Sequence, residues 1–379
     1  MRPHRSQTAR YFEVDADPGS LSGMNIVKAT AKYEAWLATH LKIVEKDLAF
    51  KHEQMRLAPF PFMRATYYRW AQLFPEVCEE IFKAPATLAV GDLHVENFGT
   101  WRDIEGRLIW GINDFDEAST LPYTNDLVRL GASALMSNLV CEPEAGLEAL
   151  LQGYIDAIQA GGRPFALAEH HTALRAMATA RLHDPEAYWA KLRALPLAAS
   201  EPPAGALKAI ARMMPERGLQ VRITTRIAGL GSLGRQRYVA IADWHGGGVA
   251  REAKALAPSA CLWAKQGKGT APIHYQEILR TAIRCRDPFV SLQKRWIVRR
   301  LAPDCSRISL GDLPQQRDEM RLLRAMGWET ANIHLGNIKP RTLLTDLKKR
   351  PRRWLFKAAR AMEKAVLADY ADFRDHSTR

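Results

Sequence analysis

The sequence predicts an α+β protein with two lobes, a mostly helical large lobe and a smaller lobe built on an antiparallel sheet. Helical periodicity dominates the first half and the end of the chain, whereas residues 221–227, 237–242 and 296–301 have the composition of strands. A chain of 379 residues is also too long for one small core, so two or three lobes are expected.

The elements of the large lobe follow from local patterns. One helix is expected over residues 24–50, where apolar side chains recur at helical spacing, and a second over residues 67–82. Short apolar runs at residues 86–90 and 107–112 have the length of strands, and each ends at a polar phrase. Helical periodicity then returns over residues 125–160.

A run rich in Pro and Ala, residues 196–205, has the composition of a connector, so the lobe boundary is expected between Ala198 and Gln220. Beyond it, Arg, Val and Thr alternate as in a sheet with one solvated face. The predicted division is a helical large lobe with the catalytic loops, a small β lobe, and a helical return to the large lobe, over residues 1–218, 219–310 and 311–379.

Composition excludes several classes of protein. Apolar residues make up 47% of the chain, which excludes a mainly disordered protein. The net charge of +13 attracts phosphates, nucleotides or nucleic acid without choosing among them. Five scattered cysteines without a Cys-x-x-Cys pair predict neither a disulfide framework nor a zinc site. No signal peptide and no membrane span are recognisable, so a cytoplasmic location is expected.

Two acidic phrases follow the predicted strands of the large lobe. They are Gly91-Asp92-Leu93-His94-Val95-Glu96-Asn97 and Asn113-Asp114-Phe115-Asp116-Glu117. An Asp followed five residues later by an Asn, and then a second Asp-Phe, is the arrangement that phosphoryl-transfer enzymes use to hold a substrate hydroxyl and Mg²⁺ together. The spacing therefore predicts a phosphoryl-transfer site.

Within this site each polar residue has an expected role. Asp92 would orient the acceptor hydroxyl, Asn97 would bind a metal ion through its amide oxygen, and Asp114 would join Mg²⁺ to the phosphates. Asp116 and Glu117 are close enough in sequence to take the metal role instead. His94 is expected to anchor the loop by hydrogen bonds and not to act as a base.

A glycine-rich hairpin is predicted in the small lobe. Gly229, Gly231 and Gly234, with Ser232 among them, separate two predicted strands and would present backbone N–H groups to phosphates. The Rossmann pattern would require a helix directly after the glycines. A strand, glycine turn and strand instead match the phosphate lid of protein-kinase-like folds, although such a turn also occurs without any ligand.

A lid of this kind requires a lysine on the next strand and an acidic partner for it. Lys254 fits the first requirement, and Glu277 is the expected partner, in the segment Tyr275-Gln276-Glu277-Ile278 that opens a predicted helix. The simpler interpretation is that Lys254 is a solvated surface residue and Glu277 favours the helix dipole. Together with the glycine hairpin, the pair favours a site that binds ATP.

Several of these phrases resemble known families. Residues 91–97 resemble the catalytic loop of aminoglycoside and choline phosphotransferases, residues 112–118 resemble their metal-binding strand end, and Asp126 is similar to the buried Asp that braces that loop. Residues 45–375 resemble the bacterial domain of unknown function family 2252, in which residues 58–64, the Gly91 loop, the Gly229 hairpin and residues 254–259 recur in this order.

The hairpin and Lys254 follow the catalytic loop, whereas in protein kinases they precede it. The resemblance therefore implies a circularly permuted, two-lobed protein-kinase-like fold. The expected function is ATP- and Mg²⁺-dependent phosphotransfer to a hydroxyl-bearing acceptor, and nucleotidyl transfer would use nearly the same residues. The alternatives are a calcineurin-like metal-dependent phosphoesterase, indicated by Asp92-x-His94, and a non-catalytic nucleotide- or nucleic-acid-binding protein.

Overall fold

The computed structural model describes residues 24–137, 140–167, 171–179, 182, 184–267, 271–305 and 316–376. The protein is a mixed α+β protein with small antiparallel sheets, as the sequence predicted. In its first half the helices are α1 (Ile26–Ala38), α2 (Glu45–Leu57), α3 (Pro59–Ala65), α4 (Tyr67–Val77), α5 (Glu79–Phe82), α6 (Tyr123–Met136) and α7 (Pro143–Ala160). The later helices are α9 (Thr172–Thr179), α10 (Pro185–Arg193), α11 (Ala204–Ala211), α12 (Ala260–Ala264), α13 (Tyr275–Thr281), α14 (Gln316–His334), α15 (Pro340–Leu347) and α16 (Trp354–His376).

Three antiparallel sheets are present in the described residues. The largest has the order β6-β7-β8-β10-β9 and consists of β6 (Arg222–Thr225), β7 (Arg237–Trp244), β8 (Gly247–Ala255), β9 (Ser291–Gln293) and β10 (Trp296–Leu301). The second contains β2 (Phe98–Arg102), β3 (Leu108–Ile112) and β5 (Phe165–Ala166). The third pairs β1 (Ala86–Ala89) with β4 (Ser119–Pro122). The hairpin predicted around the glycines is confirmed, because β6 and β7 pair across it.

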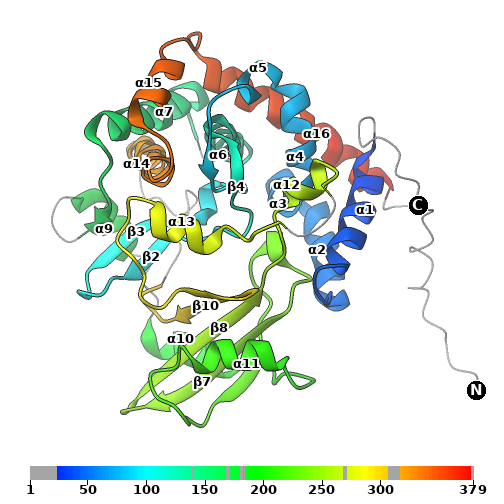
Figure 1. Cartoon of the computed structure of the whole chain (residues 1–379), viewed down its shortest axis with the longest axis vertical. Coiled ribbons are helices and arrows are strands. Elements are labelled where there is room, and N and C mark those ends of the chain that lie inside the picture. The colour runs from blue at the N-terminus through cyan, green and yellow to red at the C-terminus, as the bar shows by residue number, and fades with distance from the viewer. Residues whose placement is uncertain are drawn as a thin grey trace, which may run out of the picture.

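Most helices gather on one side of the molecule, and the five-stranded sheet lies on the other with α10 and α11 beside it (Figure 1). Helix α16 packs against α6 and α4, so the end of the chain lies beside segments from its first third. Helices α7 and α14 approach closely because Gly153 and Gly327 face the partner backbone, where a Cβ would come within 1.9 Å of a carbonyl oxygen in both cases. One apolar core extends from these helices to the large sheet.

The two faces of the five-stranded sheet differ. One face, with Tyr238 and Ala253, is covered by α11. The other bears Val239 and Leu301 at one end, where they form a small apolar cluster with Leu192 of α10. The rest of this second face, called the cleft face below, is directed toward β2, the loop after β3 and α13.

The first predicted helix is shorter than expected. The helix expected over residues 24–50 is divided into α1 and α2, because residues 39–44 turn toward the glycine hairpin and Val44 N donates to Gly234 O at 2.8 Å. Helix α2 ends at Leu57, and after the extended residue Ala58 a separate short helix, α3, begins at Pro59. Proline is tolerated there because the first helical N–H needs no intrahelical acceptor.

None of the helices in the described part of the chain is both long and apolar enough to cross a bilayer.

Candidate functional site

The loop after β1 is held in place by a buried carboxylate. Gly91 has a φ of +83°, and a Cβ on it would lie 2.4 Å from Glu117 O, so glycine is required at this turn. Asp126 on α6 accepts the backbone N–H groups of Val90 at 2.7 Å and Gly91 at 3.0 Å, and it contacts His334 at 3.1 Å. These contacts fix the backbone immediately before Asp92.

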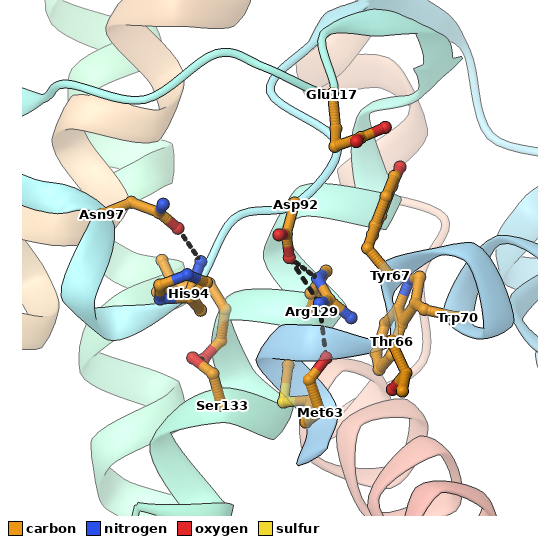
Figure 2. Close-up of polar contacts among 12 residues, drawn as sticks. Met63, Thr66, Tyr67, Trp70, Asp92, His94, Asn97, Glu117, Arg129 and Ser133 are labelled. Atoms are coloured by element: carbon orange, nitrogen blue, oxygen red, sulfur yellow. Dashed lines mark hydrogen bonds and ion pairs between the residues drawn. The ribbon is translucent and has the colours of Figure 1, made fainter. Parts of the chain in front are cut away.

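Asp92 itself is oriented by a fully buried arginine (Figure 2). Arg129 Nε donates to Asp92 Oδ1 at 2.8 Å, and Arg129 Nη2 donates both to the same oxygen and to Met63 O. The guanidinium carbon lies 4.9 Å from the ring centres of both Tyr67 and Trp70. The Asp92 side chain is 18% exposed and its Oδ2 atom makes none of these contacts.

The charge state of Asp92 depends on two opposing effects. Burial raises the pKa of the Asp92 carboxyl to about 6, although Arg129 acts to lower it. At neutral pH the group is therefore mainly ionised and is still basic enough to accept a proton.

His94 and Asn97 close the same loop (Figure 2). Asn97 Oδ1 accepts the backbone N–H of His94 at 2.6 Å, and His94 Nδ1 accepts the N–H of Glu96 at 3.2 Å. The prediction that His94 anchors the loop is confirmed. The amide oxygen of Asn97, which the sequence assigned to a metal, has one lone pair engaged in the loop and one remaining.

The second acidic phrase meets residues from the small sheet. Lys254 Nζ, on β8, lies 2.5 Å from Asp116 Oδ2 and 3.6 Å from Asp114 Oδ1. Arg235, just after the glycine turn, lies 2.8 Å from Glu117 and 3.6 Å from Asp116. Burial lowers the pKa of Lys254, whereas the two aspartates act to raise it. The simpler interpretation of Lys254 as solvated surface is wrong, because only 1% of the residue is exposed.

The glycine hairpin lies over Asp92. Gly229 and Gly234 have φ values of +74° and +88°, which favour glycine. A Cβ on Gly231 would lie 3.3 Å from Asp92 Oδ2. Ser232 Oγ donates to Gly229 O at 3.1 Å and accepts from Arg237 at 2.9 Å, so its hydroxyl stabilises the turn.

Two pockets meet at Asp114 and Gly229, which line both. The smaller, about 50 Å³, lies under the hairpin and is lined by Asp92, Asn97 and Asp116. The larger, about 760 Å³, lies between the cleft face of the five-stranded sheet and β2, the loop after β3 and α13, and it includes Lys254. Its volume is in the range of small-molecule sites.

The structure does not bring Glu277 to Lys254. Glu277 pairs with His274 at 2.7 Å and its side chain is 47% exposed. Tyr275 and Leu279 of the same helix line the large pocket, and a residue midway between them points to the opposite side at 100° per residue. Among the described residues, the ion pairs of Lys254 are those with the two aspartates.

Sequence reasoning missed Arg129 and Arg235, which hold Asp92 and Glu117. A signal for Arg129 was available, because it lies within a helical segment whose other residues are largely apolar or small. A charged residue in such a segment is buried only with a partner. For Arg235 the sequence offered no comparable signal.

The residues present fit a hard divalent cation. Asp116 Oδ1 is buried without a hydrogen-bond partner, Asp114 is 26% exposed, and the Asn97 oxygen lines the same pocket. Mg²⁺ is usually bound through one or two carboxylates plus substrate phosphates. Within the described part of the chain no group of three or more His, Cys, Asp or Glu has the spacing of a metal site, so a cage made by such side chains alone is absent there.

The fold and site together define an α+β protein with a charged cleft between a glycine-bearing sheet and two acidic loops. Residues 43–161 match the model of a family described as "Uncharacterized protein conserved in bacteria (DUF2252)". The resemblance to this family is thus confirmed over a shorter stretch than expected, which contains both acidic loops but neither the hairpin nor Lys254. No curated protein and no solved structure matches the chain.

Proposed function

We propose that the protein is an ATP- and Mg²⁺-dependent phosphotransferase that acts on a hydroxyl-bearing acceptor. One observation carries the proposal: the two acidic loops meet the glycine hairpin and the strand with Lys254, which come much later in the sequence, around Asp114. Phosphoryl transfer depends mainly on placement and neutralisation of charge, so this convergence supplies what the reaction requires.

In this proposal Asp92 positions the acceptor hydroxyl and accepts its proton. Its Oδ1 is held by Arg129, which leaves Oδ2 for the acceptor. A base whose pKa is near 6 is ionised at neutral pH and can take up a proton as the bond to phosphorus forms. Arg129 is a positioning residue because it acts only through Asp92.

Asp114, Asp116 and Asn97 would hold Mg²⁺, which neutralises phosphate charge when bound. Gly229, Gly231, Ser232 and Gly234 would cover the phosphates, and Lys254 would contact them. In the absence of phosphate, the Lys254 ammonium is balanced by Asp116 at 2.5 Å. Glu277 has no part in this arrangement because it pairs with His274.

The roles proposed for these residues also imply how their segments are ordered along the chain. In protein-kinase-like folds the glycine loop and its lysine precede the catalytic loop, whereas here they follow it. A site depends on where residues lie in space and not on chain order, so we propose a circularly permuted arrangement of this fold. The five-stranded sheet would be its small lobe and the helices its large lobe.

Two rival functions fit the contacts less well. In a calcineurin-like phosphoesterase Asp92 and His94 would both bind metal, but Asp92 is held by Arg129 and His94 Nδ1 accepts from its own loop. A protein that only binds nucleotide or nucleic acid needs no carboxylate oriented in this way. Nucleotidyl transfer would use the same residues, and its product distinguishes it.

The proposal is tested by incubating the full chain with Mg²⁺ and ATP and measuring thermal stability beside Lys254→Ala and Asp114→Ala. At a nucleotide concentration 100 times the dissociation constant, the native protein should gain about 2.7 kcal/mol. The two variants should gain much less. If millimolar nucleotide does not stabilise the native protein, the proposal fails.

Asp92→Asn should still bind ATP but transfer phosphate on the order of a hundredfold more slowly, because the lost contact matters in the transition state. Glu277→Gln is the matched control that also removes one carboxylate, and it should behave like the native protein. Release of ADP would indicate phosphoryl transfer, and release of pyrophosphate would indicate nucleotidyl transfer.

A further inference from the structure

The floor of the large pocket is an ionic network and not an apolar surface. Glu252, which is 1% exposed on the cleft face, lies 2.6 Å from Arg237, 3.0 Å from Arg226 and 4.0 Å from Arg299. In the β8–β10 register Arg299 is opposite Glu252, two residues from Lys254 along the strand. This places Arg299 diagonally across from Lys254, at a Cα separation of about 7–8 Å.

Arg284, Arg299 and Arg300 all line this pocket and have buried N–H groups without hydrogen-bond acceptors, and Arg300 also lies 3.9 Å from Asp304. Arg299 Nε and Nη2 lack hydrogen-bond partners, as do Arg284 Nε and Nη1. The Arg284 guanidinium carbon lies 4.7 Å from the ring centre of Trp101 and 5.1 Å from that of Phe115, so the aromatic rings hold it. Arg284 and Arg299 both line the large pocket.

The side chains that line the large pocket also include more cationic than carboxylic groups. Six cationic and four carboxylic side chains line the pocket. Glu252 has two close arginine partners besides Arg299, and Lys254 has its own aspartates. The Asp287 carboxyl also lines the pocket, but burial raises its pKa and so weakens its ability to balance the arginines.

We infer that Arg284 and Arg299 form a second anion subsite, so that the ligand of this cleft bears a phosphate or carboxylate group besides the phosphates at Lys254. A buried donor without an acceptor is unfavourable, and an oxyanion in the pocket would supply the missing acceptors. The planar guanidinium matches the paired oxygens of phosphate and carboxylate. As a statement about a substrate this inference rests on the proposed function, but the subsite can be tested without nucleotide.

The experiment is calorimetric titration of the full chain with inorganic pyrophosphate at one fixed salt concentration, without Mg²⁺ or ATP. Arg284→Gln and Arg299→Gln should each weaken binding about tenfold to a hundredfold, which is the usual effect of losing a charged hydrogen bond. Arg217→Gln, an exposed position outside the pocket, removes the same charge and should leave affinity unchanged.

Arg284→Lys keeps the charge between the two rings but loses the fork, so it should bind with intermediate affinity and guards against misfolding of the glutamine variant. A parallel titration with citrate tests the carboxylate source: tighter binding of citrate with the same arginine dependence also supports the subsite. The inference is overturned if neither anion binds at millimolar concentration or if the arginine variants match Arg217→Gln. Arginine-dependent binding without any response to ATP would refute the proposed function alone.

Discussion

The ion pair between Arg129 and Asp92 allows a quantitative test of how the site is built. In Arg129→Met an unbranched side chain replaces the arginine between Tyr67 and Trp70, so much of the volume is retained. The substitution removes the bonds to Asp92 and to Met63 O and leaves a carboxylate without its partner.

The magnitude follows from the burial of the two groups. Removing one partner of a buried pair destabilises a protein by about 3–5 kcal/mol. Asp92 is 18% exposed, and with a pKa already near 6 it can take up a proton once Arg129 is gone. Both effects reduce the loss, so the expected decrease in the free energy of unfolding for Arg129→Met is about 3 kcal/mol, at the lower end of that range.

The assay is urea unfolding at pH 7.5 of the native protein, Arg129→Met, Asp92→Asn and the double variant. Because the two groups contact each other, the double variant should lose about 2 kcal/mol less than the sum of the single losses. Additivity within about 0.5 kcal/mol would refute the claim that Arg129 holds Asp92. A positioning role also predicts that Arg129→Lys raises the apparent pKa of the pH–rate profile, which a purely structural role would not do.

Three further predictions test the site. The pKa of Asp92 lies above its ordinary value, at about 6, so the reactive carboxylate is lost as pH falls through 6. The rate of transfer should therefore decline about tenfold per pH unit below pH 6. A rate that is independent of pH between 5 and 7 would contradict the role of Asp92. Gly231→Ala places a Cβ 3.0 Å from Arg64 O and should slow transfer about tenfold by displacing the hairpin. The control Gly247→Ala, where the nearest atom to the new Cβ is 4.0 Å away, should leave the rate unchanged. Equal rates for the two variants in a kinetic assay would contradict a role of the hairpin in transfer. Asp116→Asn should reduce the free energy of unfolding by about 3 kcal/mol because it leaves Lys254 without its closest partner. The control Glu277→Gln, at an exposed position, should reduce it by less than about 1 kcal/mol. A larger loss for Glu277→Gln than for Asp116→Asn in chemical denaturation would refute this account.

Local sequence patterns were sufficient for the strands that frame the site. The runs at residues 86–90 and 107–112 form β1 and β3, and the glycines lie between β6 and β7 as predicted. These features depend on near neighbours in the chain and on the φ values that glycine permits. The break between α1 and α2 depends instead on a bond from Val44 to Gly234, which no local pattern contains.

Partners of buried charges were harder to predict. Arg129 lies 37 residues from Asp92, and although its apolar helical segment indicates a buried partner, nothing in the spacing identifies that partner among the 41 Asp and Glu residues of the chain. The position of Glu277 relative to Lys254 was hard to predict for a different reason. The start of this helix at Tyr275 was predicted correctly. The face on which position 277 lies depends, however, on how the helix packs on the cleft, and the residues that face the cleft are Tyr275 and Leu279.

The structure also bears on the choice of metal ligand, for which the sequence favoured Asp114 and left Asp116 and Glu117 as alternatives. Asp116 is 10% exposed and is engaged by both Lys254 and Arg235, so much of its charge is required to neutralise cations in the resting protein. Asp114 is 26% exposed, stands 3.6 Å from Lys254, and lines the pocket of Asp92 as well as the large pocket. In the proposed function Mg²⁺ would be held where the two pockets meet, so Asp114 would be its main ligand and Asp116 would mainly pair with Lys254.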